Sequence, residues 1–229
     1  MQKCGPLKIF QTKELSIDAT KVVDLMKWMK FLSFFALVSL FFFVSAQGKS
    51  RIGSYFLGFG YSMAESGSDA REANLIRLTA QAPNGSSSDI GVYLDYGSLE
   101  NNGSDTSTWK IGADYLANFN GIGGRSFRLS PFIGAGIGYL DDERPFRLGD
   151  DGFTWSLLIG SEIKFSNSLS LNLGGRFLGL WSEFGENEFT ADAGITWWFD
   201  VVHGISLEYQ RAFEAELNYF TLKYLYSWK

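Results

Sequence analysis

The sequence feature that most constrains the fold is an alternation, with a period of two, between apolar residues and small or polar ones. It recurs in ten segments of about ten to thirteen residues, each with its large apolar side chains on one of two alternating faces. A β-strand with one apolar face has this period, whereas a helix repeats every three to four residues. The predicted strands are 51–63, 73–82, 89–99, 108–119, 127–140, 153–165, 169–181, 189–199, 205–213 and 218–228.

Turn-forming residues separate the predicted strands, and the connections form two sets that alternate along the chain. The first set is mostly longer and consists of Ala64–Glu72, Glu100–Ser107, Asp141–Gly152, Ser182–Glu188 and Glu214–Leu217. The second set is mostly shorter and consists of Pro83–Ser88, Asn120–Ser126, Ser166–Ser168 and Asp200–Gly204. Long loops at one end and tight turns at the other are typical of outer-membrane β-barrels. We therefore predict an all-β fold, a closed antiparallel transmembrane barrel of about ten strands, with eight as the alternative.

Away from the strand ends, the charged residues of the predicted strands fall on the face opposite to the apolar one, while Arg211 falls on the apolar face near a strand end, where a long cation can reach the membrane surface. Glycine is also concentrated on the charged face, while the apolar face carries the bulky residues and, near segment ends, many aromatic ones. Bulky side chains fit the convex side of a closed sheet more easily, so the apolar face is predicted to meet lipid. A soluble β-sandwich that buries the apolar face is the alternative. The predicted lumen charges are Arg77, Asp95, Lys110, Asp114, Arg128, Glu162, Lys164, Arg176, Asp192, Glu208 and Lys223.

Residues 26–46 have the three parts of a secretory signal peptide. Lys27 and Lys30 precede an apolar run that extends to Val44, and small residues follow up to Ala46. The run is short for a membrane-spanning helix, so we expect cleavage, with an uncleaved anchor as the alternative. Residues 1–25 are then a preface outside the natural start, at Met26 or Met29, or an unusually long n-region. Residues 47–229 form the predicted barrel domain.

Composition limits the chemistry that this domain can carry. The single cysteine, Cys4, precedes the predicted cleavage site, so no disulfide or cysteine-based metal site is expected in the barrel. Acidic residues outnumber basic ones by 25 to 20, and no basic patch or nucleic-acid motif is present. A nucleic-acid partner is therefore not expected.

Three stretches resemble strands of OmpA-like and opacity-type outer-membrane barrels. PFIGAGIGY at residues 131–139 resembles the fifth-strand signature of that group, and residues 110–115 and 169–177 are similar to other strands. The resemblance covers most of 51–228 as a pattern and implies insertion in the bacterial outer membrane. It also implies contact with outer-membrane lipid and lipopolysaccharide, and with periplasmic chaperones and the barrel-assembly machinery during biogenesis. A monomer is expected.

The C-terminal residues resemble the signal that the barrel-assembly machinery reads. Tyr224, Tyr226 and Trp228 alternate as in that signal. The group usually ends on an aromatic residue, whereas Lys229 follows Trp228 here.

The lumen charges allow two readings. Six cations and five anions can neutralise one another in a network that plugs the barrel, or they can line a narrow, weakly selective ion pathway. The near balance of signs favours the network, because buried charges must be paired or carry a large desolvation cost.

Two other groups of residues invite chemical interpretation. His203 is the chain's only histidine and lies in a predicted turn near Asp200 and Ser206. Outer-membrane lipid A deacylases carry a serine two residues from a histidine, but Ile205 holds that position here, so a catalytic role is not expected. The acidic loop at 141–151 could bind Ca²⁺, although its spacing matches no defined calcium loop.

The sequence thus favours a non-enzymatic outer-membrane barrel with a structural or surface-interaction role and no cofactor. A small porin is the first alternative, and an outer-membrane lipid-modifying enzyme is the second.

Overall fold

The computed structural model describes residues 50–66, 71–101, 104–124, 127–142, 151–182, 184 and 187–228. The predicted preface, the predicted signal peptide and Lys229 lie outside these residues. Within them, no helix has the length and apolar character needed to cross a bilayer. The strands are β1 (Phe56–Ser66), β2 (Arg71–Pro83), β3 (Ser88–Asn101), β4 (Ser104–Asn118), β5 (Ile122–Gly123), β6 (Arg128–Asp142), β7 (Gly152–Lys164), β8 (Leu169–Leu180), β9 (Asn187–Trp198), β10 (His203–Ala212) and β11 (Leu217–Ser227).

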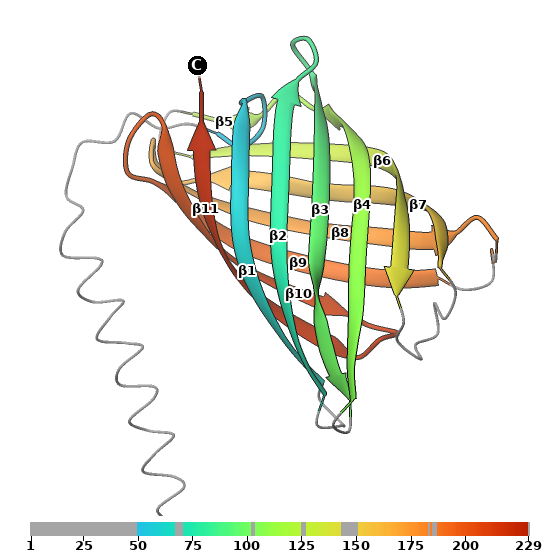
Figure 1. Cartoon of the computed structure of the whole chain (residues 1–229). Helices are drawn as coiled ribbons and strands as arrows, with labels where there is room; N and C mark the ends of the chain where they lie inside the picture. The colour runs from blue at the N-terminus through green and yellow to red at the C-terminus, as the bar shows by residue number, and fades with distance from the viewer. Residues whose placement is uncertain are drawn as a thin grey trace, which may run out of the picture. The chain divides into compact units, whose positions relative to one another are not determined.

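The described strands close into a barrel. Each long strand pairs antiparallel with its neighbours in the chain, β1 pairs with β11, and β4 pairs directly with β6. β5 is only a two-residue strand that pairs with the start of β6. Ten long strands therefore form the wall, and the prediction of ten rather than eight is confirmed. In Figure 1, β1 to β4 form the near wall, and β6 to β10 cross behind them.

The two ends of the barrel differ in their connections. We call turn end the end that holds 84–87, 119–127, 165–168 and 199–202, together with the start of β1 and the end of β11. We call loop end the opposite end, where β1, β3, β6, β8 and β10 end and β2, β4, β7, β9 and β11 begin.

The outer surface carries the apolar register. Along β1, Leu57, Phe59 and Tyr61 point outward and alternate with inward residues such as Ser62. Phe59 is 56% exposed, whereas Ser62 is 0% exposed. Every other long strand likewise carries exposed large apolar side chains on its outer face. An apolar band that surrounds a closed sheet is the surface of a barrel embedded in lipid, since such a barrel leaves no strand edge unpaired in hydrocarbon.

Aromatic side chains gather near both ends of the outer surface. Near the turn end, Phe127 lies 6.3 Å from Phe165, measured between ring centroids. Near the loop end, Trp109 stacks on Tyr139 at 5.3 Å, and Tyr139 meets Phe153 edge-on at 5.4 Å. Two such belts are the girdles that anchor a barrel at the two membrane–water interfaces.

Several predicted boundaries are wrong, for identifiable reasons. β1 begins at Phe56 rather than at residue 51, because Gly53 has a φ of 73° and the chain is not yet extended there. The predicted long loop Glu100–Ser107 is mostly strand, since β3 and β4 stay paired as far as Asn101 and Ser104. Ladder pairing needs backbone groups only, so it continues through polar residues.

The inner face is less uniformly polar than the sequence pattern predicts. Near the loop end, a buried apolar cluster lines the inner wall: Ala64, Ala73, Leu75, Ala212, Leu217 and Tyr219. Near the turn end, Phe56, Trp198 and Leu225 form a second cluster. The charged residues that concern the site therefore lie mainly between two apolar zones.

Candidate functional site

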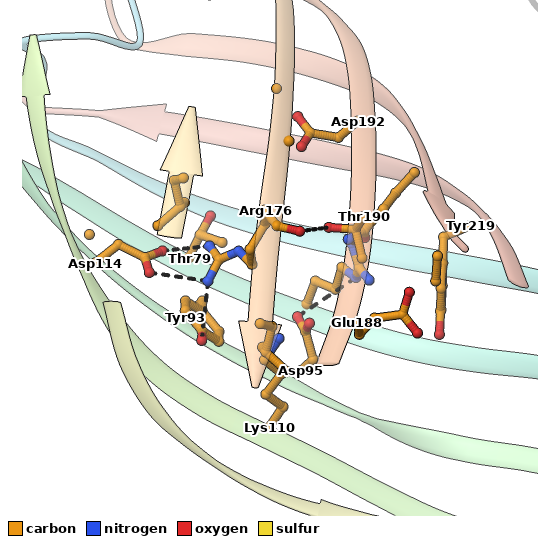
Figure 2. Close-up of a pocket in the computed structure, with 18 of the residues that line it drawn as sticks. Thr79, Tyr93, Asp95, Lys110, Asp114, Arg176, Glu188, Thr190, Asp192 and Tyr219 are labelled. Atoms are coloured by element: carbon orange, nitrogen blue, oxygen red, sulfur yellow. Dashed lines mark hydrogen bonds and ion pairs between the residues drawn. The ribbon is translucent and has the colours of Figure 1, made fainter. Parts of the chain in front are cut away.

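The centre of the barrel contains a cavity of about 370 Å³, which we call the central cavity. Figure 2 shows its charged lining. Of the eleven predicted lumen charges, seven line it: Arg77, Asp95, Lys110, Asp114, Arg176, Asp192 and Lys223.

The best-connected group in the central cavity is Arg176 on β8. Its guanidinium donates two hydrogen bonds to the Asp114 carboxylate on β4, at 3.1 Å and 2.6 Å. It also donates to the hydroxyls of Tyr93 and Ser156, at 3.4 Å and 3.2 Å, and lies 5.0 Å from the Tyr93 ring centroid. Because β4 and β8 are separated by β6 and β7, this bidentate pair links distant parts of the wall (Figure 2).

Glycine makes the room for this group. A Cβ at Gly136 on β6 would overlap the Asp114 carboxylate, and a Cβ at Gly112 on β4 would overlap the hydroxyl of Tyr93. The glycines of the inner register thus let Asp114 and Tyr93 lie flat against the wall and meet Arg176.

A second group lies on β2, β3 and β4, where Arg77, Asp95 and Lys110 are paired in one row across the sheet. Arg77 Nε lies 3.7 Å from Asp95 Oδ1, and Arg77 Nη1 donates a 3.0 Å hydrogen bond to Gln210 on β10. The Arg77 guanidinium also lies 5.2 Å from the Tyr219 ring centroid. Arg77 therefore reaches from β2, past β1 and β11, to the wall at β10.

A third group surrounds Glu208 on β10. Lys223 Nζ donates to one carboxylate oxygen at 2.8 Å, and Arg51 Nη1 donates to the other at 2.9 Å. Ser206 adds a hydroxyl donor at 3.0 Å. This carboxylate is thus fully engaged by two cations, one of which comes from outside the strands.

The residues before β1 cross the lumen at the turn end; we call Ser50–Gly53 the mouth segment. The Ser50 hydroxyl and the Arg51 backbone N–H both donate to Glu162 on β7. The Gly53 backbone N–H donates to the Asp89 carboxylate on β3, at 3.0 Å and 3.2 Å. With Arg51 bound to Glu208, the segment is attached at three places around the wall.

The mouth segment satisfies carboxylates that are otherwise isolated. Glu162 is 1% exposed, and among the described residues its hydrogen-bond donors are Ser50 and Arg51. Asp89 is 0% exposed and receives one further donor, the Asn118 side-chain amide, at 2.7 Å. Gln81 on β2 fixes the segment from another direction by donating to the Arg51 carbonyl at 2.9 Å. Without the mouth segment, Glu162 would be a buried charge with no hydrogen-bond donor among the described residues. The docking of the segment is therefore strongly favoured.

The remaining predicted lumen charges lie outside the lining of the central cavity. Arg128 and Lys164 occupy inner-register positions directly opposite each other on β6 and β7, near the turn end. Glu162 lies two residues before Lys164 on β7, and Glu208 lies beside the mouth segment.

Four described charged residues of the lumen lie outside the predicted set. Arg51 falls in a predicted strand, Asp89 at the end of one, and Glu188 and Glu214 in predicted loops. Glu188 accepts the backbone N–H groups of Glu214 and Ala215, at 3.2 Å and 3.0 Å, and thereby holds the 213–216 connection. The alternation with a period of two could have identified two of these residues. Asp89 lies on the same face of its strand as Asp95, and Glu188 lies on the same face as Asp192, whereas no pattern of this kind marks Arg51.

His203 lies in an aromatic cluster on the outside of the barrel rather than beside a nucleophile. It is the first residue of β10, and its Nδ1 lies 2.5 Å from the hydroxyl of Tyr224. Its ring stacks on Phe199 at 6.2 Å and lies 5.6 Å from Tyr226. The cluster lies at the turn-end girdle, where an amphipathic ring suits the membrane–water interface.

The turn before His203 is fixed by Asp200. Its carboxylate accepts the backbone N–H groups of Val202 and His203, at 2.6 Å and 2.5 Å. Burial acts to raise the pKa of Asp200, but these two donors outweigh it and hold the pKa below its usual value.

The other predicted chemical features are placed as follows. Among the described residues, no group of three or more His, Cys, Asp or Glu side chains is arranged to hold a metal ion. Most of the acidic loop, at 143–150, lies outside the described residues. Of the C-terminal aromatic residues, Tyr224 and Tyr226 point outward on β11, and Trp228 lies 6.0 Å from the ring of Tyr55.

Comparisons with known proteins return barrels at low similarity. No protein-family model matches the sequence, and no curated protein matches it. The translocator domain of the autotransporter NalP from Neisseria meningitidis is 11% identical, with a TM-score of 0.45 over 93% of this chain and 99% of that one. Neisserial surface protein A is 10% identical, with a TM-score of 0.39 over 79% and 100%. The KdgM porin in complex with disordered oligogalacturonate is 9% identical, with a TM-score of 0.40 over 76% and 99%. Similarities at this level do not assign a function to the chain.

Proposed function

We propose that this protein is a non-enzymatic barrel of the bacterial outer membrane, with a structural or surface-interaction role and a lumen closed by its charged network. The observation that carries the proposal is the mouth segment, which crosses the lumen and binds Asp89, Glu162 and Glu208 on three different strands. A wide water-filled channel would leave this end of the barrel open.

Pairs that cross the lumen support the same proposal. Arg176 joins β8 to Asp114 and Tyr93 on β4 and β3, while Arg77 joins β2 to Gln210 on β10. Among the described residues, Arg51 adds a cation to the eleven predicted lumen charges, and Asp89, Glu188 and Glu214 add anions, so the two signs stay nearly balanced. A balanced network gains most from internal pairing and presents little net charge to a passing ion.

The location in the outer membrane is inferred from the surface. The apolar outer face and the two aromatic belts are those of a lipid-embedded barrel. Membership in the OmpA-like and opacity-type group remains part of the proposal, supported by the resemblance of residues 131–139. So do contacts with lipopolysaccharide, periplasmic chaperones and the barrel-assembly machinery, and the monomeric state.

A small porin is the second candidate, and one observation favours it. The lining of the central cavity extends from Arg51 at the turn end to Glu214 and Ala215 at the loop end. A modest displacement of the mouth segment would lengthen this space toward the turn end.

Recording in planar lipid bilayers separates the two candidates. For the purified, folded protein we expect no reproducible open conductance level. Folding is checked in the same preparation by the shift in gel mobility on heating. A stable, repeated open level in the unaltered protein would contradict the closed lumen and favour the porin.

A variant provides the matched control for this recording. Arg51→Ala removes the guanidinium bonded to Glu208 and loosens the mouth segment. Arg211→Ala removes a cation that bonds Asn218 on the outer side near the loop end. We expect channel openings in Arg51→Ala only; equal recordings from both variants would mean that the mouth segment does not close the barrel.

A further inference from the structure

We propose that the central cavity binds a small oxyanion, such as a carboxylate, sulfate or phosphate group, against the wall formed by β2, β3 and β4. The proposed site consists of Arg77, Thr79, Tyr93 and Lys110. Figure 2 shows the last three of these, with Arg176 approaching from β8. This proposal does not depend on whether the barrel conducts ions, because binding in a closed cavity needs no path through the membrane.

The site is rich in hydrogen-bond donors that lack acceptors. Arg77 Nε and Thr79 Oγ1 are both buried, and neither has a hydrogen-bond partner among the described residues. Lys110 makes no ion pair with any described residue; its ammonium lies 5.4 Å from the Tyr93 ring centroid. Because an unpaired cation in a low-dielectric cavity is costly, Lys110 beside these two unsatisfied donors indicates that an acceptor is missing at this wall.

The strand register brings these donors together. Arg77 and Lys110 flank Asp95 in one row, while Thr79 and Tyr93 are paired in the next inward row. Gly112 completes the second row and leaves the space above β4 to the Tyr93 ring. The Tyr93 hydroxyl accepts a hydrogen bond from Arg176, so its own proton remains available to a ligand.

The local charge balance favours an anion, and Asp95 opposes it. Arg176 and Asp114 neutralise each other through their bidentate contact. Arg77 and Lys110 are then balanced by Asp95 alone, whose contact with Arg77 is a loose 3.7 Å. One positive charge is left over at this wall, and an oxyanion would neutralise it.

The opposite wall limits the kind of ligand. Asp192 on β9 lines the same cavity, and no ion pair joins it to a described residue. Its carboxylate, together with those of Glu188 and Glu214 in the same lining, repels a second anionic group. The cavity of about 370 Å³ therefore suits a small ligand with one oxyanion group rather than a polyanion.

Sulfate is the probe for the test, because its charge does not change near neutral pH. Isothermal titration calorimetry of the folded protein in zwitterionic detergent, at constant ionic strength set with sodium chloride, should show saturable sulfate binding. Lys110→Met should weaken it about tenfold or more, since a charged hydrogen-bond donor is lost. Lys110→Arg should retain binding.

Two further variants distinguish a built site from general attraction to cations. Lys164→Met removes a cation that points inward near the turn end but does not line the cavity, and it should leave sulfate affinity unchanged. Asp95→Asn removes the competing anion and should strengthen binding about fivefold. Absence of saturable binding in the unaltered protein, or equal losses in Lys110→Met and Lys164→Met, would overturn the proposal. Acetate, titrated in parallel, shows whether one carboxylate suffices as the ligand group.

Discussion

Leu222→Arg should lower the free energy of unfolding from a lipid bilayer by about 2–4 kcal/mol, the cost of an arginine facing lipid at the midplane. Leu222 lies in the middle of β11, points outward and is 55% exposed. Its cross-strand neighbours Tyr61 and Leu207 are apolar and exposed too, so the new guanidinium would find no partner there. Equilibrium unfolding from vesicles in guanidinium chloride, followed by tryptophan fluorescence, measures the change.

Leu57→Arg is the matched control, because it makes the same substitution at a different depth. Leu57 also points outward, but it is the second residue of β1 and lies beside Tyr226 in the turn-end girdle. An arginine there reaches the headgroups, and we expect a loss of about 0–1 kcal/mol. Equal losses at Leu57 and Leu222 would argue against a membrane midplane at the centre of β11.

Arg176→Met should lower the free energy of unfolding by about 3 kcal/mol, because it leaves Asp114 as a buried carboxylate without its cation. The Asp114 side chain is only 10% exposed, and among the described residues Arg176 is the cation that pairs with it. Breaking a buried ion pair usually lowers the free energy of unfolding by about 3–5 kcal/mol. We expect the lower end of that range, since the central cavity leaves room for water beside the carboxylate. The same unfolding measurement applies.

The double variant Arg176→Met/Asp114→Leu tests the cause of that loss. Replacement of both charged partners by apolar residues of similar volume removes the isolated carboxylate, so most of the lost stability should return. If the double variant is no more stable than Arg176→Met, the loss arises from packing around Tyr93 and Ser156 rather than from an unpaired charge.

The parts of the fold that depend on residue alternation are predictable from the sequence. The period of two fixes which residues share a face, so the outward positions of Phe59, Leu157 and Leu222 follow directly. The same rule places Arg77, Asp114 and Arg176 on the inner face. Ten strands with alternating connections then close with β1 beside β11.

The features that depend on tertiary contacts are not predictable in this way. The mouth segment lies inside the barrel because Glu162 and Glu208, over a hundred residues away, need donors, and no local pattern reports this. Strand ends extend past the apolar pattern because ladder hydrogen bonds join backbone groups only. Apolar inner residues such as Leu75 and Leu217 are not predicted by the expectation of a polar lumen. They face inward because side chains that fill a narrow barrel can pack on one another.

The central claim is that apolar side chains face lipid while the charged ones face the barrel axis. Spin labels at single cysteines test it most directly, since Cys4 is the chain's only native cysteine and can be replaced by serine. In vesicles, a label at Leu222→Cys should collide often with lipid-soluble oxygen and rarely with a water-soluble nickel chelate. A label at Asp192→Cys should show a much lower ratio of oxygen to nickel collisions. The reverse order, with the Asp192 label in lipid and the Leu222 label shielded from it, would contradict the account.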